Sequence, residues 1–482
     1  MRRALKYVVG GAAGATFVTL LIGGTALAEE ADPVAELATA TNLLWVVIGA
    51  ILVIFMQAGF ALVETGFTQK KNAAHVMSTN FAIFGLGFVG FLFIGFPLAF
   101  GGFSYSAFGL DTPMNGDGYA WLGGHSTGLL YWGYDHLGHA ATPALLAFFL
   151  YMVAFMDTVA TIPTGAMAER WKWKAFVQWG LFCGAIYYPL FAAWTWGGGW
   201  LAKAWDTMSL GTGYVDFAGS GVVHAVGGVA GLAGAMVLGP RIGKYGPDGK
   251  PRAIPAHNIP LAIAGCFILL FGWFGFNAAS TFAATDVQFA TVATNTAIAA
   301  AVGSVIAMYW ITYRSGKPDP GMMVNGMLAG LVAITAPCAF VSPWAAALIG
   351  ALAAVIVIEA AMFLERKGID DPVGAVAVHG IGGTFGVLCV GIFANGDYGA
   401  GWNGAVDDAG NPIKIEGLLQ GEVGQFVIQL IGCVVIWTVI LGLAFAFFKI
   451  QNSLMKGGIR PSEEEELQGV DIAEMGVLGY VD

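Results

Sequence analysis

Long apolar runs recur along most of this chain, and they restrict the folds that it can adopt. A run of roughly twenty apolar residues crosses the hydrocarbon core of a bilayer, about 30 Å thick, as one α-helix. Hydrophobic residues make up 57% of the chain and charged residues only 11%, which excludes a soluble globular protein. We therefore expect an all-α integral membrane protein. Eleven transmembrane helices are predicted, at residues 42–68, 77–101, 142–168, 174–196, 217–238, 258–280, 288–312, 320–338, 343–364, 373–395 and 420–448.

The first 28 residues have the pattern of a secretory signal peptide. Three basic residues stand among the first six, an apolar run follows at 8–23, and Ala-Leu-Ala at 26–28 forms a small-residue cleavage site. This order of charged, apolar and small residues is typical of a cleaved signal. The alternative is an uncleaved first span. We predict that residues 1–28 are removed and that the mature N-terminus lies outside the cell.

The distribution of basic residues supports this topology. With an outer N-terminus and an odd number of spans, the C-terminus lies inside. Of the 21 Lys and Arg residues, three belong to the signal peptide, two (Lys203 and Lys414) fall in outer loops, and the other sixteen fall inside. Such an excess on the cytoplasmic side is the rule for membrane proteins. The sequence thus predicts a membrane domain at 29–448 and a cytoplasmic tail at 449–482.

One polar pattern occurs twice, 155 residues apart. Asp216 precedes His224 by the same interval as Asp371 precedes His379, and a Gly-Gly pair follows each histidine after two intervening residues. Both copies lie in strongly apolar runs, where an ionisable side chain is costly to bury and commonly marks a transport path. A packing role is the ordinary alternative for a single histidine. Two matched copies favour histidines that line a pore.

The topology places the two copies in opposite orientations. Spans at 42–238 and at 258–395 form inverted halves of five helices each, and the span at 420–448 is an addition. This plan is common among transporters whose site lies at the midplane. Each histidine lies about 12 Å of helix beyond its aspartate, and half of the hydrocarbon core is about 15 Å. We therefore expect the two histidines to meet near the midplane.

Three stretches together resemble one family. They read Asp-Phe-Ala-Gly-Ser-Gly-Val-Val-His at 216–224, Phe-Gly-Trp-Phe-Gly-Phe-Asn at 271–277, and Asp-Asp-Pro at 370–372 leading to Val-His-Gly at 378–380. With these stretches in this order and spacing, the chain is similar to bacterial ammonium transporters of the Amt/Mep/Rh family, from about residue 42 into the tail. The resemblance implies a homotrimer that carries ammonium or ammonia across the bacterial plasma (inner) membrane, without enzymatic activity.

The resemblance also implies roles for individual residues. His224 and His379 match the twin histidines of the family's hydrophobic pore. Phe155 and Phe276 match the stacked pair that closes its outer mouth, and Trp273 is a further aromatic residue of the pore region.

An ammonium recruitment site outside the phenylalanine pair is implied as well. Trp196 and Ser280 match its indole and its hydroxyl, and Tyr151 stands where the family has another aromatic ring. An interfacial aromatic belt is the alternative for the rings. Asp216 and Asp371 match carboxylates that support the pore and favour cations. Helix N-capping is an alternative role for both aspartates, and it is compatible with that one.

These side chains suit the chemistry of ammonium. Aromatic faces attract a cation by about 0.5 to 2 kcal/mol each, and a hydroxyl oxygen accepts an N–H. A bare ion in an apolar lumen faces a Born cost of order 20 kcal/mol, which deprotonation to ammonia avoids. Imidazoles donate and accept hydrogen bonds and can pass a proton between them. Both proton co-transfer and neutral ammonia transfer are compatible with these residues, as is methylammonium as a substrate.

Three other functions fit parts of the pattern. A Rhesus-type channel for neutral gases is one, although Trp196, Phe276 and Ser280 together favour ammonium recruitment. An ammonium sensor is another, but a tail of 34 residues is too short for a fused signalling domain. Paired helical histidines can also ligate a haem. We expect no cofactor, no metal site and no nucleic-acid partner.

Other ionisable residues lie within the predicted spans or the outer loop. Asp157, Glu64 and Glu359 fall in spans, where we favour structural hydrogen bonds between helices over a part in ion handling. Asp157 is also a departure from the family pattern. Three outer-loop histidines have a spacing that suits a metal, but solvation is the better interpretation; they are His125, His136 and His139.

The tail carries four consecutive glutamates at 463–466 and resembles the C-terminal region of the family. The resemblance implies that it lies against the inner faces of neighbouring subunits in a homotrimer. It also implies regulation by a PII-type signal protein. A solvated acidic tail is the alternative.

Overall fold

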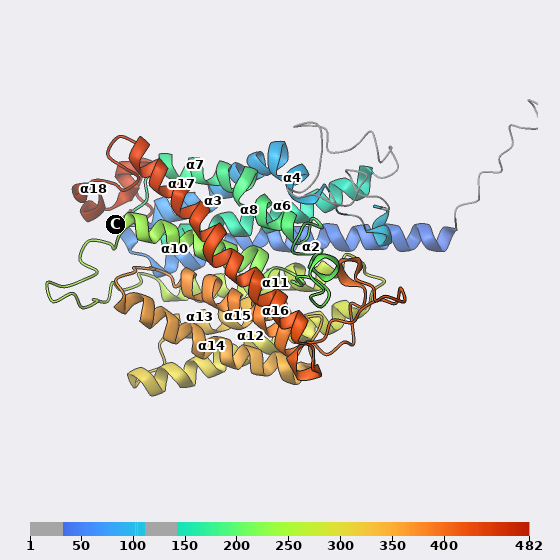
Figure 1. Cartoon of the computed structure of the whole chain (residues 1–482). Coiled ribbons are helices and arrows are strands. Elements are labelled where there is room, and N and C mark those ends of the chain that lie inside the picture. Colours follow the sequence, from blue (N-terminus) through green and yellow to red (C-terminus); the bar gives the residue numbers. More distant parts are fainter. Residues whose placement is uncertain (1–31, 102, 104, 111–141, 482) are drawn as a thin grey trace, which may run out of the picture.

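Helices make up nearly all of this computed structural model, which describes residues 32–101, 103, 105–110 and 142–481. The long helices run side by side in one bundle (Figure 1). Ten of the described helices are long and apolar enough to cross a membrane, and the shorter apolar helix α13 (Pro320–Ile334) packs among them. Together they correspond to the eleven predicted spans, so the all-α membrane fold is confirmed. The predicted signal peptide at 1–28 lies outside the described residues.

The spans follow the predicted order. Those of the first half are α2 (Pro33–Phe67), α3 (Ala73–Gly90) continued by α4 (Phe96–Phe100), α6 (Thr142–Ala166), α7 (Trp173–Phe182) continued by α8 (Tyr188–Trp194), and the π-helical turn η6 (Ser220–Ala225) continued by α10 (Val226–Leu238). Those of the second half are α11 (Ile259–Asn277), α12 (Gln288–Ser315), α13, α14 (Pro343–Arg366), and the π-helical turn η8 (Val376–Ile381) continued by α15 (Gly382–Phe393). The eleventh span is α16 (Val423–Val435) continued by α17 (Leu441–Leu454).

Several helices begin at a capping side chain followed by proline. Asp32, Asn258 and Asp319 each accept a backbone N–H of the first turn at 3.0 Å, and a proline stands within the first two helical positions. These caps satisfy N–H groups that have no partner inside the helix. Because Asp32 and Pro33 supply such a start, the first helix begins at Pro33, nine residues before the apolar run predicted at 42–68.

The two histidine-bearing helices cross at glycines. A methyl group on Gly228 would lie 2.1 Å from the backbone nitrogen of Gly380, and one on Gly383 would lie 2.3 Å from the carbonyl oxygen of Ser220. No side chain fits at such distances, so only glycine allows the two backbones to touch here. The Gly-Gly pairs thus admit a neighbouring backbone beside the histidines.

We expect the substitution Gly228→Ala to destabilise the protein by about 1 to 3 kcal/mol, because the added methyl group meets backbone that cannot rotate away. Thermal unfolding in detergent, followed by intrinsic fluorescence, measures the effect. Gly442→Ala in α17 is the matched control, since nothing lies within 4 Å of a methyl group added there. An unchanged Tm in Gly228→Ala would contradict the close crossing.

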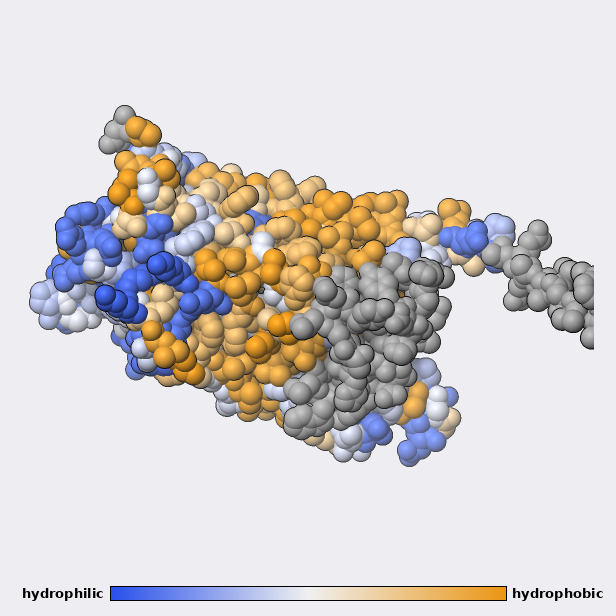
Figure 2. Space-filling model, turned by 90° about the horizontal axis from the view of Figure 1, so that it is seen from above, coloured by the Kyte–Doolittle hydropathy of each residue, from blue (hydrophilic) through white to orange (hydrophobic). Residues whose placement is uncertain are grey.

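The outer surface is apolar across the middle of the molecule. Figure 2 shows this band, with hydrophilic residues gathered at the end that carries the C-terminal tail. Large apolar side chains lie exposed on it, among them Phe81, Phe267 and Phe271, as suits contact with lipid chains. We call the end with α18 (Glu463–Gln468) and the loop at 239–257 the tail face. The opposite end, with the loops at 195–219 and 394–422, is the loop face.

The C-terminal tail folds back onto the tail face of its own chain. The Asp471 carboxylate accepts the backbone N–H groups of Ala74 and His75, at 3.0 and 2.8 Å, at the start of α3. Glu474 accepts the backbone N–H of Trp173 at 2.9 Å at the start of α7. Carboxylates stabilise helix N-termini because these carry unpaired N–H groups and the positive end of the helix dipole. The tail is therefore docked through Asp471 and Glu474, whereas Glu463 and Glu464 of the acidic run are exposed, as the alternative of a solvated tail predicted.

Candidate functional site

A column of rings runs through the middle of the bundle. Phe155 of α6 stacks on Phe276 of α11, with ring centroids 4.1 Å apart and planes inclined by 15°. His224 stacks on Phe276 at 5.3 Å and on Trp273 at 5.1 Å. His379 stacks on His224 at 5.2 Å. Five residues singled out in the sequence therefore come together in one column.

The two histidines also form a direct hydrogen bond. Nδ1 of His379 lies 3.2 Å from Nδ1 of His224, so one ring donates and the other accepts. His224 is fully buried, and its Nε2 has no hydrogen-bond partner among the described residues. The prediction that the histidines meet is confirmed. A haem does not fit between them, because the rings stack on each other and bond directly.

Each histidine is placed by the aspartate eight residues before it. The Asp216 carboxylate accepts the backbone N–H groups of Gly219, Gly221 and Val222 at 2.7, 2.8 and 2.9 Å. In the second half, the Asp371 carboxylate accepts two N–H groups of the corresponding turn at 2.9 and 2.7 Å. Both aspartates thus cap the helices that carry the histidines, as the capping interpretation predicted.

Both capped helices open with a π-helical turn that contains the histidine, η6 in one half and η8 in the other. Single π-turns within helices occur mostly at functional sites. No pattern in the sequence indicated them, since hydrophobic periodicity does not separate a π-turn from an α-helix.

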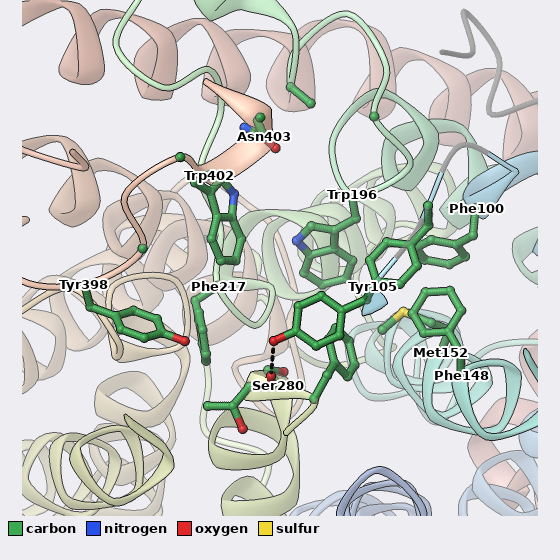
Figure 3. A pocket seen from close by; sticks show the side chains of 18 of the residues that line it. Phe100, Tyr105, Phe148, Met152, Trp196, Phe217, Ser280, Tyr398, Trp402 and Asn403 are labelled. Carbon is green, nitrogen blue, oxygen red and sulfur yellow. Dashed lines mark hydrogen bonds between the residues drawn. The ribbon is translucent and has the colours of Figure 1, made fainter. Parts of the chain in front are cut away.

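A cavity of about 590 Å³ opens above the column on the loop face (Figure 3). Trp196, Phe155 and Ser280 line it, as the recruitment site requires. Tyr151 does not line it. This residue is fully buried behind the wall, where its hydroxyl group lies 3.0 Å from Oγ of Ser280 and donates to the carbonyl oxygen of Gly275 at 2.9 Å.

Several wall residues of this cavity were missed in the sequence. They are aromatic and come from separate stretches of the chain: Tyr105 before α6, Phe217 before η6, Phe282 after α11, and Tyr398 and Trp402 in the loop at 394–422.

Below the histidines, the column meets two further cavities. A small one of about 20 Å³ is lined by His379, Phe60 and Glu64. A larger one of about 380 Å³ opens at the tail face. The two cavities share Asn325 and Val373 as lining residues, so they adjoin each other. The ring column therefore separates a space on the loop face from a space on the tail face.

The acids within the predicted spans differ in their surroundings. Glu64 accepts hydrogen bonds from Asn80 at 2.6 Å and from Thr164 at 2.8 Å. Glu359 is bound by the indole of Trp310 at 3.0 Å and by Arg314. Both fit the structural role that the sequence favoured, although Glu64 also lines the small cavity.

Asp157 does not fit the expectation of a hydrogen bond between helices. Its side chain is buried, and Oδ1 has no partner among the described residues. Within the described part of the chain, no group of three His, Cys, Asp or Glu side chains is placed to hold a metal. The three loop histidines, His125, His136 and His139, lie outside it.

Curated relatives match nearly the whole chain. The model of the Ammonium Transporter Family matches residues 44–480. Ammonium transporter Amt2 of Archaeoglobus fulgidus is 43% identical over 441 residues, which cover 91% of this chain and 88% of the relative. Ammonium transporter Amt1 of Haloferax mediterranei is 34% identical over 464 residues, which cover 92% of this chain and 80% of the relative.

Solved structures share the fold. One described as "Sensor Amt Protein" superposes with a TM-score of 0.77 at 36% identity, over 91% of this chain and 99% of that chain. Mep2 of Candida albicans superposes with a TM-score of 0.70 at 26% identity, over 88% of this chain and 87% of that chain. On the extent of the family match and the identity to its curated members, the chain belongs to the ammonium transporter family.

Proposed function

We propose that this chain binds ammonium in the loop-face cavity, deprotonates it, and passes ammonia along the histidine column to the tail face. The observation that carries the proposal is the continuous ring column from Phe155 through Phe276 and His224 to His379, with a cavity at each end. In this proposal the loop face lies outside the cell and the tail face in the cytoplasm, in agreement with the distribution of basic residues.

Recruitment takes place at the floor of the loop-face cavity. The Ser280 hydroxyl donates to the carbonyl oxygen of Phe276 at 2.7 Å, so its own oxygen is left to accept an N–H from ammonium. The Trp196 indole N–H donates to the carbonyl oxygen of Asp216 at 2.7 Å. The indole therefore offers the ion its ring face instead of its N–H, and an aromatic face attracts a cation.

Deprotonation follows because the path beyond is narrow and apolar. The Phe155 and Phe276 rings are in van der Waals stacking at 4.1 Å, so a hydrated ion does not pass between them unless a ring rotates. Neutral ammonia avoids the cost of an unpaired buried charge. The unpartnered Nε2 of His224 is free to bond ammonia, and the hydrogen bond between the two histidines offers the proton a path.

The proposal is tested with purified protein in liposomes on a solid-supported membrane. We expect a saturable current after an ammonium jump and none after a potassium jump, because the aromatic floor and the hydroxyl select a cation that can lose a proton. A dye inside the liposomes reports pH in parallel. A pH rise without current would instead make the protein a channel for neutral ammonia, of the Rhesus type.

A sensor is the second candidate, favoured by the 36% identity to the protein described as a sensor Amt. The same experiment separates the two functions. Ammonium binding measured by calorimetry, with neither current nor pH change, would make this chain a sensor.

We further infer a homotrimer with a PII-type regulatory protein at the tail face, on the basis of the family alone. Native mass spectrometry in detergent tests the subunit number, and a mass that corresponds to a single chain would refute it.

A further inference from the structure

The loop-face cavity is much larger than ammonium requires. Ammonium is close in size to a water molecule, whose share of liquid volume is about 30 Å³, whereas the cavity measures about 590 Å³. The proposed recruitment site uses only its floor, at Trp196, Phe155 and Ser280. The space above that floor has no part in the mechanism described so far.

Aromatic rings form the walls of this upper space. Of the 21 lining residues that belong to the described part of the chain, ten are Phe, Tyr or Trp. Phe217 and Trp402 form one wall, with ring centroids 6.1 Å apart, and Tyr105 and Phe282 form another, at 5.9 Å. Figure 3 shows Trp402, Phe217 and Tyr105 around the same space as Trp196. An aromatic cage open to the loop face results.

The loop that brings Trp402 into the wall is held in place. The Trp402 ring packs on Phe340 at 5.5 Å. The next residue, Asn403, donates from its side-chain amide to the carbonyl oxygens of Thr212 and Tyr214 at 2.9 and 3.0 Å. The cage is thus preformed, so a ligand does not have to order it on binding.

The chemistry of the lining selects one class of ligand. Among the described lining residues none is acidic, and the one charged side chain is Lys203, whose ammonium group donates to the carbonyl oxygen of Asn403 at 3.3 Å. Ring faces attract cations without forming hydrogen bonds. A quaternary ammonium ion has no N–H to satisfy, and aromatic cages are its typical binding sites.

We propose that the upper cage binds an alkylated, quaternary ammonium ion that is not transported. The stacked Phe155 and Phe276 rings close the floor to its methyl groups. It has no proton to lose, so the deprotonation route is closed to it as well. The bound cation occupies the entrance and competes with ammonium. The competition rests on the proposed transport function, whereas the binding itself does not.

Tetramethylammonium is the probe. Titration calorimetry with the purified wild-type protein is expected to show saturable binding, with one ion per chain. In liposomes the probe alone gives no current, and it raises the apparent KM for ammonium while the maximal current stays the same. Absence of heat, together with an unchanged KM, would overturn the proposal.

Three variants locate the site. In Trp402→Leu one ring of the cage is lost. The inhibition constant of tetramethylammonium, divided by the KM for ammonium of the same variant, is therefore expected to rise about tenfold. Trp344→Leu is the matched control, because that indole is 62% exposed on α14. Lys203→Gln removes the fixed positive charge and is expected to tighten inhibition severalfold. Equal inhibition of the wild type, Trp402→Leu and Lys203→Gln would overturn the assignment of the cage.

The two proposals fail in different ways. Calorimetric binding of tetramethylammonium without any ammonium transport would refute the transport function and leave the cage intact. Ammonium transport without tetramethylammonium binding would refute the cage and leave the transport function intact.

Discussion

Replacement of both histidines, in the variant His224→Ala with His379→Ala, is expected to lower the ammonium current on the order of a hundredfold. Ammonia in the column would lose its hydrogen-bonding partners, each worth about 1 to 3 kcal/mol when a polar group is otherwise unsatisfied. Loss of about 3 kcal/mol from the highest barrier corresponds to roughly two powers of ten in rate. The direct route for a proton disappears as well. Among the described residues, the Nδ1 to Nδ1 bond at 3.2 Å is the only hydrogen bond between two side chains of the ring column.

Current recorded after an ammonium jump measures this loss, and a potassium jump on the same liposomes tests selectivity. His257→Ala is the control, because His257 lies in the tail-face loop, where its ring bonds Thr68 and Tyr480 instead of pore residues. A double variant that carries ammonium at the wild-type rate and still excludes potassium would contradict the twin-histidine path. A variant that gains potassium current would support it, since alanine leaves space that water can fill.

The features that could be predicted from the sequence are those set by long periodic signals. The eleven apolar runs predict the spans, because only helices and closed barrels satisfy their backbone groups inside a bilayer. The distribution of basic residues predicts the orientation that we propose for them. The repeated Asp-to-His interval was sufficient to place His224 and His379 together, since an inverted pair of helices of equal length must bring them to equal depth. Their direct hydrogen bond then follows from the glycines that let the two helices touch.

The features that the sequence did not predict depend on tertiary contacts, which leave no periodic pattern in the sequence. The upper cage is formed by single rings, such as Phe217 and Trp402, that lie about 185 residues apart in the chain and meet at 6.1 Å. Glu64 of α2 lines the small cavity, but nothing in the apolar run around it in the sequence indicated that position. The docking of the tail by Asp471 was likewise hidden, because an acidic residue near a terminus most often remains solvated.

A network of buried charged residues holds the loops of the tail face together. Arg241 binds the Asp370 carboxylate through Nε at 2.8 Å and through a terminal nitrogen at 2.9 Å. It also forms a salt bridge with Glu169, whose carboxylate in turn accepts the backbone N–H of Gln69 at 2.7 Å. Arg170 donates to the carbonyl oxygen of Asp370 at 2.6 Å. The network thereby ties the loops that follow the first, third, fifth and ninth spans.

Arg241→Met is expected to destabilise the protein by about 3 to 5 kcal/mol, because it leaves two buried carboxylates without their cation. Arg241, Glu169 and Asp370 are all at most 6% exposed. Arg314→Met is the matched control, since its pair with Glu359 is 39% and 35% exposed. Exposed pairs contribute about 0 to 1 kcal/mol. Unfolding by SDS in mixed micelles measures both variants, and equal losses would refute the difference between the two pairs.

The same network predicts how stability depends on pH. Burial alone would raise the pKa of Asp370, but the hydrogen bonds and charge of Arg241, together with the charge of Arg170, outweigh it and lower that pKa to about 2. A carboxyl whose pKa falls on folding stabilises the folded state above its usual pKa near 4, and this contribution disappears as pH falls toward 2. We therefore expect the wild type to lose about 2 kcal/mol of stability from this residue between pH 4 and 2. Asp370→Asn should be less stable at pH 7 and should lack that loss. A variant whose stability falls as steeply as that of the wild type over this range would show that other carboxylates govern the acid sensitivity of the tail face.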